Sequence, residues 1–164
     1  MANLSRKEIR SEMANWGRVK PITAEVGGRL ITFRSKLEYY WAVWCQLRKE
    51  QGIITDWLYE SEEVPIVYKT GRVDFYRPDF TIQDGPEYSF EETKGWFQAK
   101  DKTKMKLFAE QYDNPLTLIF AKPPSGIQYR RADGLVKLLE SNGGRVIYDA
   151  NKTIFKPIKH LFEF

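Results

Sequence analysis

Large apolar residues recur at steps of three and four between residues 34 and 51, which is the period of an amphipathic helix. Ser35 and Glu38 have the spacing of a capping box at the start of this segment, and Gly52 follows its end. The same period recurs in two later segments. The pattern therefore predicts helices over residues 34–51, 100–112 and 131–141.

Segments rich in β-branched and aromatic residues lie around these helices and predict strands. Asp84-Gly85-Pro86 separates two of them and is typical of a hairpin turn. One later run is continuously apolar and bounded by prolines, as in a buried strand. The predicted strands are residues 55–59, 64–68, 72–82, 88–94, 116–121 and 145–148.

The order of predicted elements is helix, three or four strands, helix, strand, helix, strand. This order predicts an α/β fold with a single domain, in which helices flank a mixed central β-sheet. We place the domain at residues 31–150, between an N-terminal basic arm (1–30) and a C-terminal tail (151–164). Either end could complete a dimer or contact DNA.

The composition excludes several classes of protein. With 164 residues and 42% hydrophobic positions, the chain is an ordinary globular one, and it has no apolar run long enough to span a membrane. The charged start of the chain argues against export, so we expect a cytoplasmic protein. Cys45 is the one cysteine and His160 the one histidine, which excludes an internal disulfide and a histidine-based metal site or triad.

The net charge of +4 is distributed unevenly. Residues 51–93 contain three basic and ten acidic residues, a net charge of −7, whereas the rest of the chain has 23 basic and 12 acidic residues, a net charge of +11. A basic chain with an acidic middle third indicates a polyanion-binding protein with a cation site, although solvated surfaces also carry uneven charge.

The most informative residues lie at the predicted hairpin. Because alternate residues of a strand face the same way, Glu92 and Lys94 share one face, while Glu91 faces away and is expected to be solvated. Asp79 lies on the preceding strand, so its carboxylate could reach Glu92. Two carboxylates beside an ammonium group favour a missing cation or phosphate, and Mg²⁺ prefers oxygen ligands of this kind.

Pro78-Asp79, followed by Glu92-x-Lys94, resembles the motif of the PD-(D/E)xK nuclease superfamily. That family also has a glutamate on a helix before the motif, and Glu38 matches it. The resemblance covers roughly residues 31–121. It implies a restriction-endonuclease-like core with the order α-β-β-β-α-β.

Three segments narrow the resemblance to the small phage-encoded members of this superfamily: residues 35–39, 76–80 and 92–95. That group is similar to the archaeal Holliday-junction resolvases, which are metal-dependent homodimers. The resemblance implies a homodimeric endonuclease that cuts branched or double-stranded DNA, above all four-way junctions, in phage recombination or replication. It further implies Mg²⁺ as cofactor, with Mn²⁺ as a substitute, and no organic cofactor.

The resemblance also assigns roles to individual residues. It implies that Asp79 and Glu92 ligate one or two Mg²⁺ ions, with the backbone carbonyl of Thr93 as a further ligand. Glu38 would contribute from the helix, directly or through water. Lys94 would orient the attacking water while the metal stabilises charge on the phosphate.

A second set of residues is predicted to bind DNA. Lys102 and Lys106 are four residues apart on one helix face, where they could contact backbone phosphates without reading the sequence. Trp96 and Phe97 follow the motif and could wedge against an unpaired base. The complete predicted DNA-binding set is Arg77, Trp96, Lys100, Lys102, Lys104 and Lys106.

Plain structural interpretations and two other functions stay open. Glu38 could only cap its helix, Asp79 could only end a strand, and Glu92 with Lys94 could be a surface cross-strand pair. The lysine-rich helix could be a solvated face. The alternatives to a resolvase are a duplex or flap endonuclease of the same superfamily, acting in replication, repair or transposition, and a non-catalytic DNA-binding module on the nuclease fold.

Overall fold

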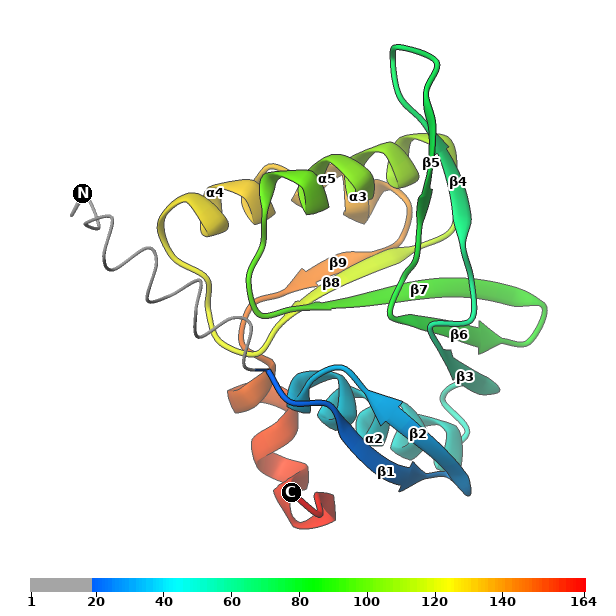
Figure 1. The fold of residues 1–164 in the computed structure, drawn as a ribbon. Helices are drawn as coiled ribbons and strands as arrows, with labels where there is room; N and C mark the ends of the chain where they lie inside the picture. Colours follow the sequence, from blue (N-terminus) through cyan, green and yellow to red (C-terminus); the bar gives the residue numbers. More distant parts are fainter. Residues whose placement is uncertain (1–18) are drawn as a thin grey trace.

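The computed structural model describes residues 19–164, arranged around a five-stranded sheet (Figure 1). The strand order is β3-β6-β7-β8-β9. The first three strands pair antiparallel, whereas β7, β8 and β9 run parallel. The strands are β3 (Asp56–Tyr59), β6 (Phe80–Asp84), β7 (Glu87–Lys94), β8 (Leu116–Phe120) and β9 (Arg145–Ile147).

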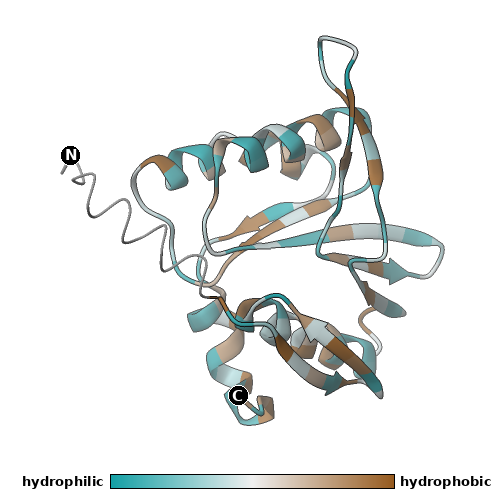
Figure 2. Cartoon of the chain, viewed as in Figure 1, coloured by the Kyte–Doolittle hydropathy of each residue, from teal (hydrophilic) through white to brown (hydrophobic). Residues whose placement is uncertain are grey.

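Helices cover the sheet on both sides, which confirms the predicted α/β fold. Helix α2 (Lys36–Glu50) packs over a core that includes Trp41, Trp57 and Phe80. The opposite core includes Met105 and Phe108 and lies under α3 (Ala99–Gln111), α4 (Gly126–Asp133) and α5 (Val136–Ser141). Figure 1 shows α2 and the C-terminal helical turns below the sheet and α3, α4 and α5 above it. Figure 2 shows that these helices carry both hydrophobic and hydrophilic residues, as amphipathic helices do.

Two predicted elements are each divided in the structure. The run over residues 72–82 forms β5 (Val73–Tyr76) and β6, which belong to different sheets. Pro78 lies in the break, and proline lacks the N–H that a continuous ladder needs. The helix predicted over residues 131–141 begins earlier and is interrupted around Gly134, giving α4 and α5.

Strand β5 pairs with β4 (Val64–Val67) in a separate two-stranded sheet that projects beside α3 (Figure 1). This hairpin is inserted between β3 and β6. Without it, the helix and the strands of the main sheet follow the order α2, β3, β6, β7, α3, β8. This is the α-β-β-β-α-β order expected above.

A second hairpin, β1 (Ile22–Val26) and β2 (Arg29–Phe33), packs on α2 through buried Ala24 and Val26. Most of this hairpin lies within the predicted N-terminal arm (1–30). Gly27 and Gly28 connect its two strands, and both have positive φ, as a two-residue type I′ turn requires. The remainder of the predicted arm, residues 1–18, lies outside the described residues.

The C-terminal tail also joins the α2 layer. It forms a π-helical turn (Asn151–Phe155) and a 3₁₀ helix (Lys156–Leu161), and Phe155 is buried. The ring of Phe162 stacks on Tyr40 with centroids 4.0 Å apart, and the Tyr40 hydroxyl donates to the carbonyl of Phe164 at 2.9 Å. Over residues 19–164, no helix has both the length and the apolar character needed to cross a membrane.

Candidate active site

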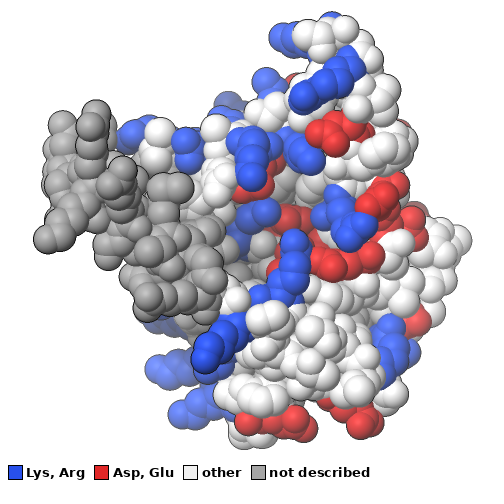
Figure 3. Space-filling model, viewed as in Figure 1, with Lys and Arg blue, Asp and Glu red and all other residues white. Residues whose placement is uncertain are grey.

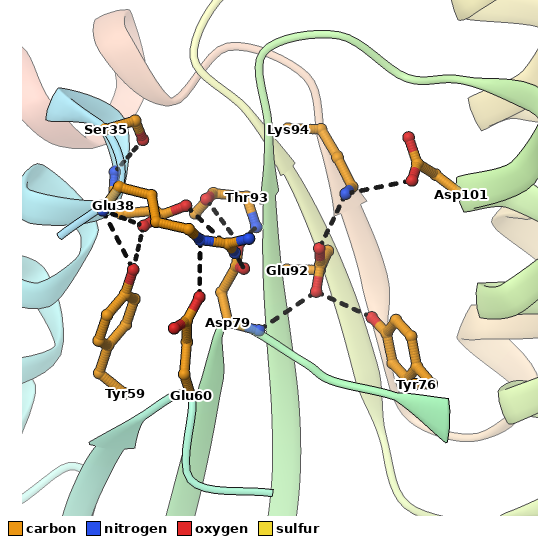
Figure 4. A network of polar contacts seen from close by, with 11 residues as sticks. Ser35, Glu38, Tyr59, Glu60, Tyr76, Asp79, Glu92, Thr93, Lys94 and Asp101 are labelled. Atoms are coloured by element: carbon orange, nitrogen blue, oxygen red, sulfur yellow. Dashed lines mark hydrogen bonds and ion pairs between the residues drawn. The ribbon is translucent and has the colours of Figure 1, made fainter. Parts of the chain in front are cut away.

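Three of the four predicted catalytic residues, Glu38, Asp79 and Lys94, line a cavity of about 540 Å³ where β6 begins, β7 ends and α2 starts (Figure 4). Glu92 is not among its lining residues. Lys94 and Gly95 line it at the end of β7, and Trp96 and Lys100 line it on the way into α3. Its lining also includes Arg34 and Thr93.

Strand pairing brings Asp79 next to the end of β7. Phe80 pairs with Glu91, so Asp79, one residue earlier, lies beside Glu92 and Thr93. The backbone N–H of Asp79 donates to Glu92 Oε2 at 3.2 Å. Both the N–H and the hydroxyl of Thr93 donate to Asp79 Oδ2 at 2.8 Å. The Asp79 carboxylate is therefore buried and held in one orientation.

The structure places the two carboxylates on different sides of β7. Glu92 and Lys94 share one side, as strand alternation predicts, and their charged atoms are 3.0 Å apart (Figure 4). The Asp79 carboxylate lies on the other side with Thr93. The expected contact between Asp79 and Glu92 thus forms through the backbone N–H of Asp79, not between the two carboxyl groups.

Glu38 lies in the first turn of α2 and lines the cavity. Ser35 is the N-cap: its hydroxyl accepts from the backbone N–H of Glu38 at 3.2 Å. The Glu38 carboxylate accepts hydrogen bonds from the backbone N–H of Arg34 at 3.0 Å and from the hydroxyl of Tyr59, and not from the N–H of Ser35. The side chain is buried on the Asp79 side of β7. The second half of the expected capping box is therefore not formed, and the Glu38 carboxylate faces the site instead.

Arg34 is a site residue that the sequence analysis missed. Its guanidinium lies 2.8 Å from Asp79, 2.6 Å from Glu60 and 3.5 Å from Glu38, yet 63% of the side chain is exposed. One cation is thus shared by three carboxylates. Nothing in the sequence pattern indicates this, because Arg34 is only the first residue of the predicted helix (34–51) and Glu60 had no expected role.

On the other side of β7, the Glu92 carboxylate is buried and contacts polar groups of the protein. The hydroxyl of Tyr76 donates to Glu92 Oε2 at 3.0 Å, and Lys94 provides the counter-charge. Lys94 also lies 3.6 Å from Asp101 in the first turn of α3. Tyr76 and Asp101 were also missed. Tyr76 lies two residues before Pro78, and Asp101 is the acidic residue among the lysines, but neither position by itself predicts a role.

Burial raises the pKa of the three carboxyl groups. Desolvation and the charge of Asp79 raise the pKa of Glu38 to about 7 and that of Glu92 to about 8. Burial raises the pKa of Asp79 as well, against the opposing effects of Lys94, Thr93 and Arg34. Burial lowers the pKa of Lys94, but Glu92 and Asp101 more than offset it, so the net shift is upward. The positive charges of Lys94 and Arg34 therefore do not fully offset the cost of burying these three carboxyl groups in their ionised form.

This incomplete compensation of charge and the all-oxygen donor set fit a hard divalent cation. Within residues 19–164, no three acidic, histidine or cysteine side chains converge closely enough to enclose a metal ion. Mg²⁺ does not need such a cage, because it commonly binds one or two carboxylates and completes its shell with water and substrate phosphate. The guanidinium of Arg34 shows that the Asp79 and Glu38 carboxylates already share a cation on this side of β7.

The predicted DNA-binding residues are dispersed by the fold. Lys100 and Trp96 line the cavity, as expected for groups that could contact a substrate. Lys102 and Lys106 line a different groove farther along α3. Phe97 is fully buried against Phe120, so the idea that it wedges against a base is wrong.

Besides Lys106, which lies 3.8 Å from Glu110, two of the predicted DNA contacts form ion pairs within the protein. Arg77 is exposed and pairs with Glu63. Lys104 lies 3.5 Å from Asp74 and donates to the carbonyl of Phe75 at 3.2 Å, which ties α3 to β5. The positions of the Arg77 and Lys104 side chains are thus explained by contacts within the protein, without DNA.

The expectation that Glu91 is solvated is wrong. Its carboxylate is buried under α2, where it accepts hydrogen bonds from both terminal nitrogens of Arg48 and from Trp41 Nε1 at 3.3 Å. Cys45 packs beside them, and burial raises the pKa of its thiol, as expected for an unreactive core residue. Strand alternation was predicted correctly here, but β7 is covered on both faces.

Comparison with known proteins does not assign the chain to a family. No family model and no curated protein matches the chain. Among solved structures, the chain is similar to protein VC1899 from Vibrio cholerae, with 16% sequence identity and a TM-score of 0.48. The match covers 99% of this chain and 46% of that protein, so the chain spans less than half of its length.

Proposed function

We propose that the protein is a Mg²⁺-dependent endonuclease that hydrolyses DNA phosphodiester bonds, with four-way junctions or other branched DNA as its substrate. One observation supports this most strongly. Glu38, Asp79 and Glu92 are buried with raised pKa values; Glu38 and Asp79 line an open cavity together with Lys94, and Lys94 pairs with Glu92. Buried carboxyl groups with perturbed pKa values are typical of functional sites, and this group coincides with the motif of the PD-(D/E)xK resemblance.

In this proposal the metal lies beside Asp79, with Glu38 and the carbonyl of Thr93 as further ligands. Glu92 would join them by turning from its place beside Tyr76 and Lys94 toward the cavity. When bound, Mg²⁺ would polarise the phosphate and a water molecule. Thr93 keeps the Asp79 carboxylate in its orientation through two hydrogen bonds. Lys94 lies at the cavity wall and is suited to orient the attacking water.

Partners that hold other site residues complete the proposed arrangement. Tyr76 donates a hydrogen bond to the Glu92 carboxylate, and Asp101 keeps Lys94 charged and directed toward Glu92. We further propose that the protein acts as a homodimer in the cytoplasm, since two symmetric cuts in a junction need two active sites. In a phage context this is the cytoplasm of the host.

The test is a Mg²⁺ titration with a labelled four-way junction beside matched linear duplex and flap DNA. The wild-type protein is expected to make paired symmetric nicks in the junction. Asp79→Asn is expected to lower the rate by at least about 10²-fold, because it removes a charged metal ligand, while DNA binding is largely kept. Asp113→Asn makes the same chemical change on an exposed residue after α3 and serves as the control.

The other outcomes separate the alternatives. Preferential cutting of duplex or flap DNA would replace the junction by that substrate and keep the chemistry. Metal-independent binding without cutting would identify a DNA-binding module. Undiminished cutting by Asp79→Asn would overturn the assignment of the active site, provided that its circular dichroism spectrum matches that of the wild type.

A further inference from the structure

A second groove lies between the turn of the β4–β5 hairpin and the outer face of α3. Its volume is about 700 Å³. We call it the hairpin groove, and its lining includes Tyr68, Lys69, Thr70, Arg72, Lys102 and Lys106.

The hairpin groove is strongly basic. Lys69 and Arg72 come from the turn and Lys102 and Lys106 from the helix, whereas Glu110 is its one acidic lining residue. Glu110 pairs with Lys106 at 3.8 Å. Over residues 19–164, the other three cations have no ion pair within 4.0 Å. Figure 3 shows that Lys and Arg side chains gather at the tip of the hairpin and along the helix beside it.

The turn that carries these cations is held in a defined conformation. The guanidinium of Arg72 lies 4.2 Å from the ring centre of Tyr68, and the Tyr68 N–H donates to the Arg72 carbonyl at 2.8 Å. Gly71 has a φ of +83°, which favours glycine. The side chain of Gln111 bonds both the N–H and the carbonyl of Val67, at 2.9 and 2.8 Å, so α3 anchors the hairpin.

Helix α3 connects this groove to the candidate active site. Asp101 pairs with Lys94 in the catalytic cavity, and the next residue, Lys102, lines the hairpin groove. At about 1.5 Å per residue, Lys106 lies about 8 Å along the helix from Asp101. Phosphates of one strand of B-form DNA follow each other at about 3.4 Å along its axis, so this distance corresponds to roughly two or three phosphates.

From this placement we infer that the hairpin groove binds the backbone of the DNA arm beside the cut, at least roughly two nucleotides from the cleaved bond. The inference rests on the proposed function, because it assumes that the cleaved phosphodiester bond lies in the candidate catalytic cavity. Backbone contacts position a duplex without reading its sequence. The hairpin groove would therefore set where along an arm the cut falls.

The first test compares DNA binding by the wild type and by Lys69→Ala/Arg72→Ala, in EDTA so that nothing is cut. Fluorescence anisotropy with a labelled junction and duplex gives Kd over a range of salt. Loss of two phosphate contacts should lower the slope of log K against log [salt] by about 1.8. Between about 50 and 200 mM salt, the wild type should lose about 12-fold more affinity than the variant.

Lys137→Ala/Arg145→Ala is the control, because these two residues are exposed on α5 and β9 and line neither the catalytic cavity nor the hairpin groove. It removes the same net charge and should keep the wild-type slope. Lys69→Ala alone changes only an exposed side chain at the turn, so it cannot act through the Tyr68–Arg72 contact. It should lower the slope by about 0.9.

The second test neutralises the DNA instead of the protein. Methylphosphonates placed at least roughly two nucleotides from the cut should weaken binding by the wild type and have little effect on the Lys69→Ala/Arg72→Ala variant. Equal weakening of both proteins would overturn the inference, as would a variant slope equal to that of the control. If the wild type cuts DNA in either case, the proposed function survives.

The experiments also distinguish a DNA-binding hairpin groove from a nuclease activity. Binding that depends on Lys69 and Arg72 without any metal-dependent cutting would support the hairpin groove as a DNA site and refute the nuclease. A wild-type protein that binds neither junction nor duplex would overturn both.

Discussion

Raising the pH is expected to destabilise the metal-free protein, chiefly through Glu92. This carboxyl group is buried, and desolvation together with the nearby Asp79 raises its pKa from 4.5 to about 8. The folded protein therefore binds this proton more tightly than the unfolded chain does. The stabilising contribution is complete below pH 4.5 and is lost as the pH rises through about 8.

The size of the effect follows from the two pKa values. With 4.5 in the unfolded chain and about 8 in the folded protein, Glu92 contributes about 2–3 kcal/mol less to the free energy of unfolding at about pH 8.5 than at about pH 6. Glu38 acts in the same direction, because its pKa is raised to about 7. The lowered stability at high pH reflects the burial of these carboxylates and the nearby charge of Asp79, which Lys94 and Arg34 offset only in part.

Urea denaturation in EDTA at these two pH values measures the effect. Glu92→Gln replaces the titrating carboxyl group by an amide, whose oxygen can still accept the hydrogen bond from the Tyr76 hydroxyl. It should match the wild type at pH 6 within about 1 kcal/mol and exceed it at pH 8.5 by about 2–3 kcal/mol. Glu87→Gln, on an exposed residue of the β6–β7 turn, is the control and should follow the wild type at both pH values.

Mg²⁺ should reverse the decline of the wild type at high pH, because it binds the ionised carboxylates. A ligand at about 100 times its Kd adds about 2.7 kcal/mol to the free energy of unfolding. The Glu92→Gln protein should gain less. The reasoning would be refuted by wild-type stability that is equal or greater at pH 8.5 in EDTA, or by a Glu92→Gln protein that is no more stable than the wild type there.

Three further substitutions test other contacts. Arg34→Ala leaves its three carboxylates without their shared cation and should lower stability at pH 8.5 in EDTA by about 1 kcal/mol, a loss that Mg²⁺ should abolish in the same urea titration. Arg48→Ala leaves the Glu91 carboxylate buried without its partner and should lower the free energy of unfolding by about 3–5 kcal/mol; a loss under 1 kcal/mol would contradict this. Gly144→Ala would place a Cβ against the carbonyl of Leu116, and should lower the thermal midpoint by at least about 4 °C, unless β9 can move away from β8.

The arrangement of charge on the surface gives the uneven sequence charge a spatial meaning. Figure 3 shows acidic side chains at the centre of one face, with basic side chains on either side. Part of the negative charge of residues 51–93 belongs to the candidate site through Asp79, Glu92 and Glu60. Glu91 belongs instead to a buried ion pair. The acidic residues of this segment therefore have two roles: some belong to the candidate site, and one forms a buried structural ion pair.

Local patterns in the sequence were enough to predict most elements of the fold. The period of the apolar residues placed α2 and α3 within two residues of their observed ends, and the capping pair of Ser35 and Glu38 marked the start of α2. Strand alternation placed Glu92 and Lys94 on one side of β7. These features depend on neighbours in the chain, which is why a single sequence determines them.

Tertiary structure alone decided which distant groups share the site. Arg34, Glu60 and Tyr59 reach Glu38 and Asp79 because β2, β3 and α2 meet there, and no local pattern encodes that meeting. Burial of Glu91 likewise depends on α2 covering β7. Desolvation and charge contacts across the fold, rather than residue type, raise the pKa of the carboxyl groups. The sequence alone determined which residues can carry the chemistry, and the packing of the elements determined which charges face one another.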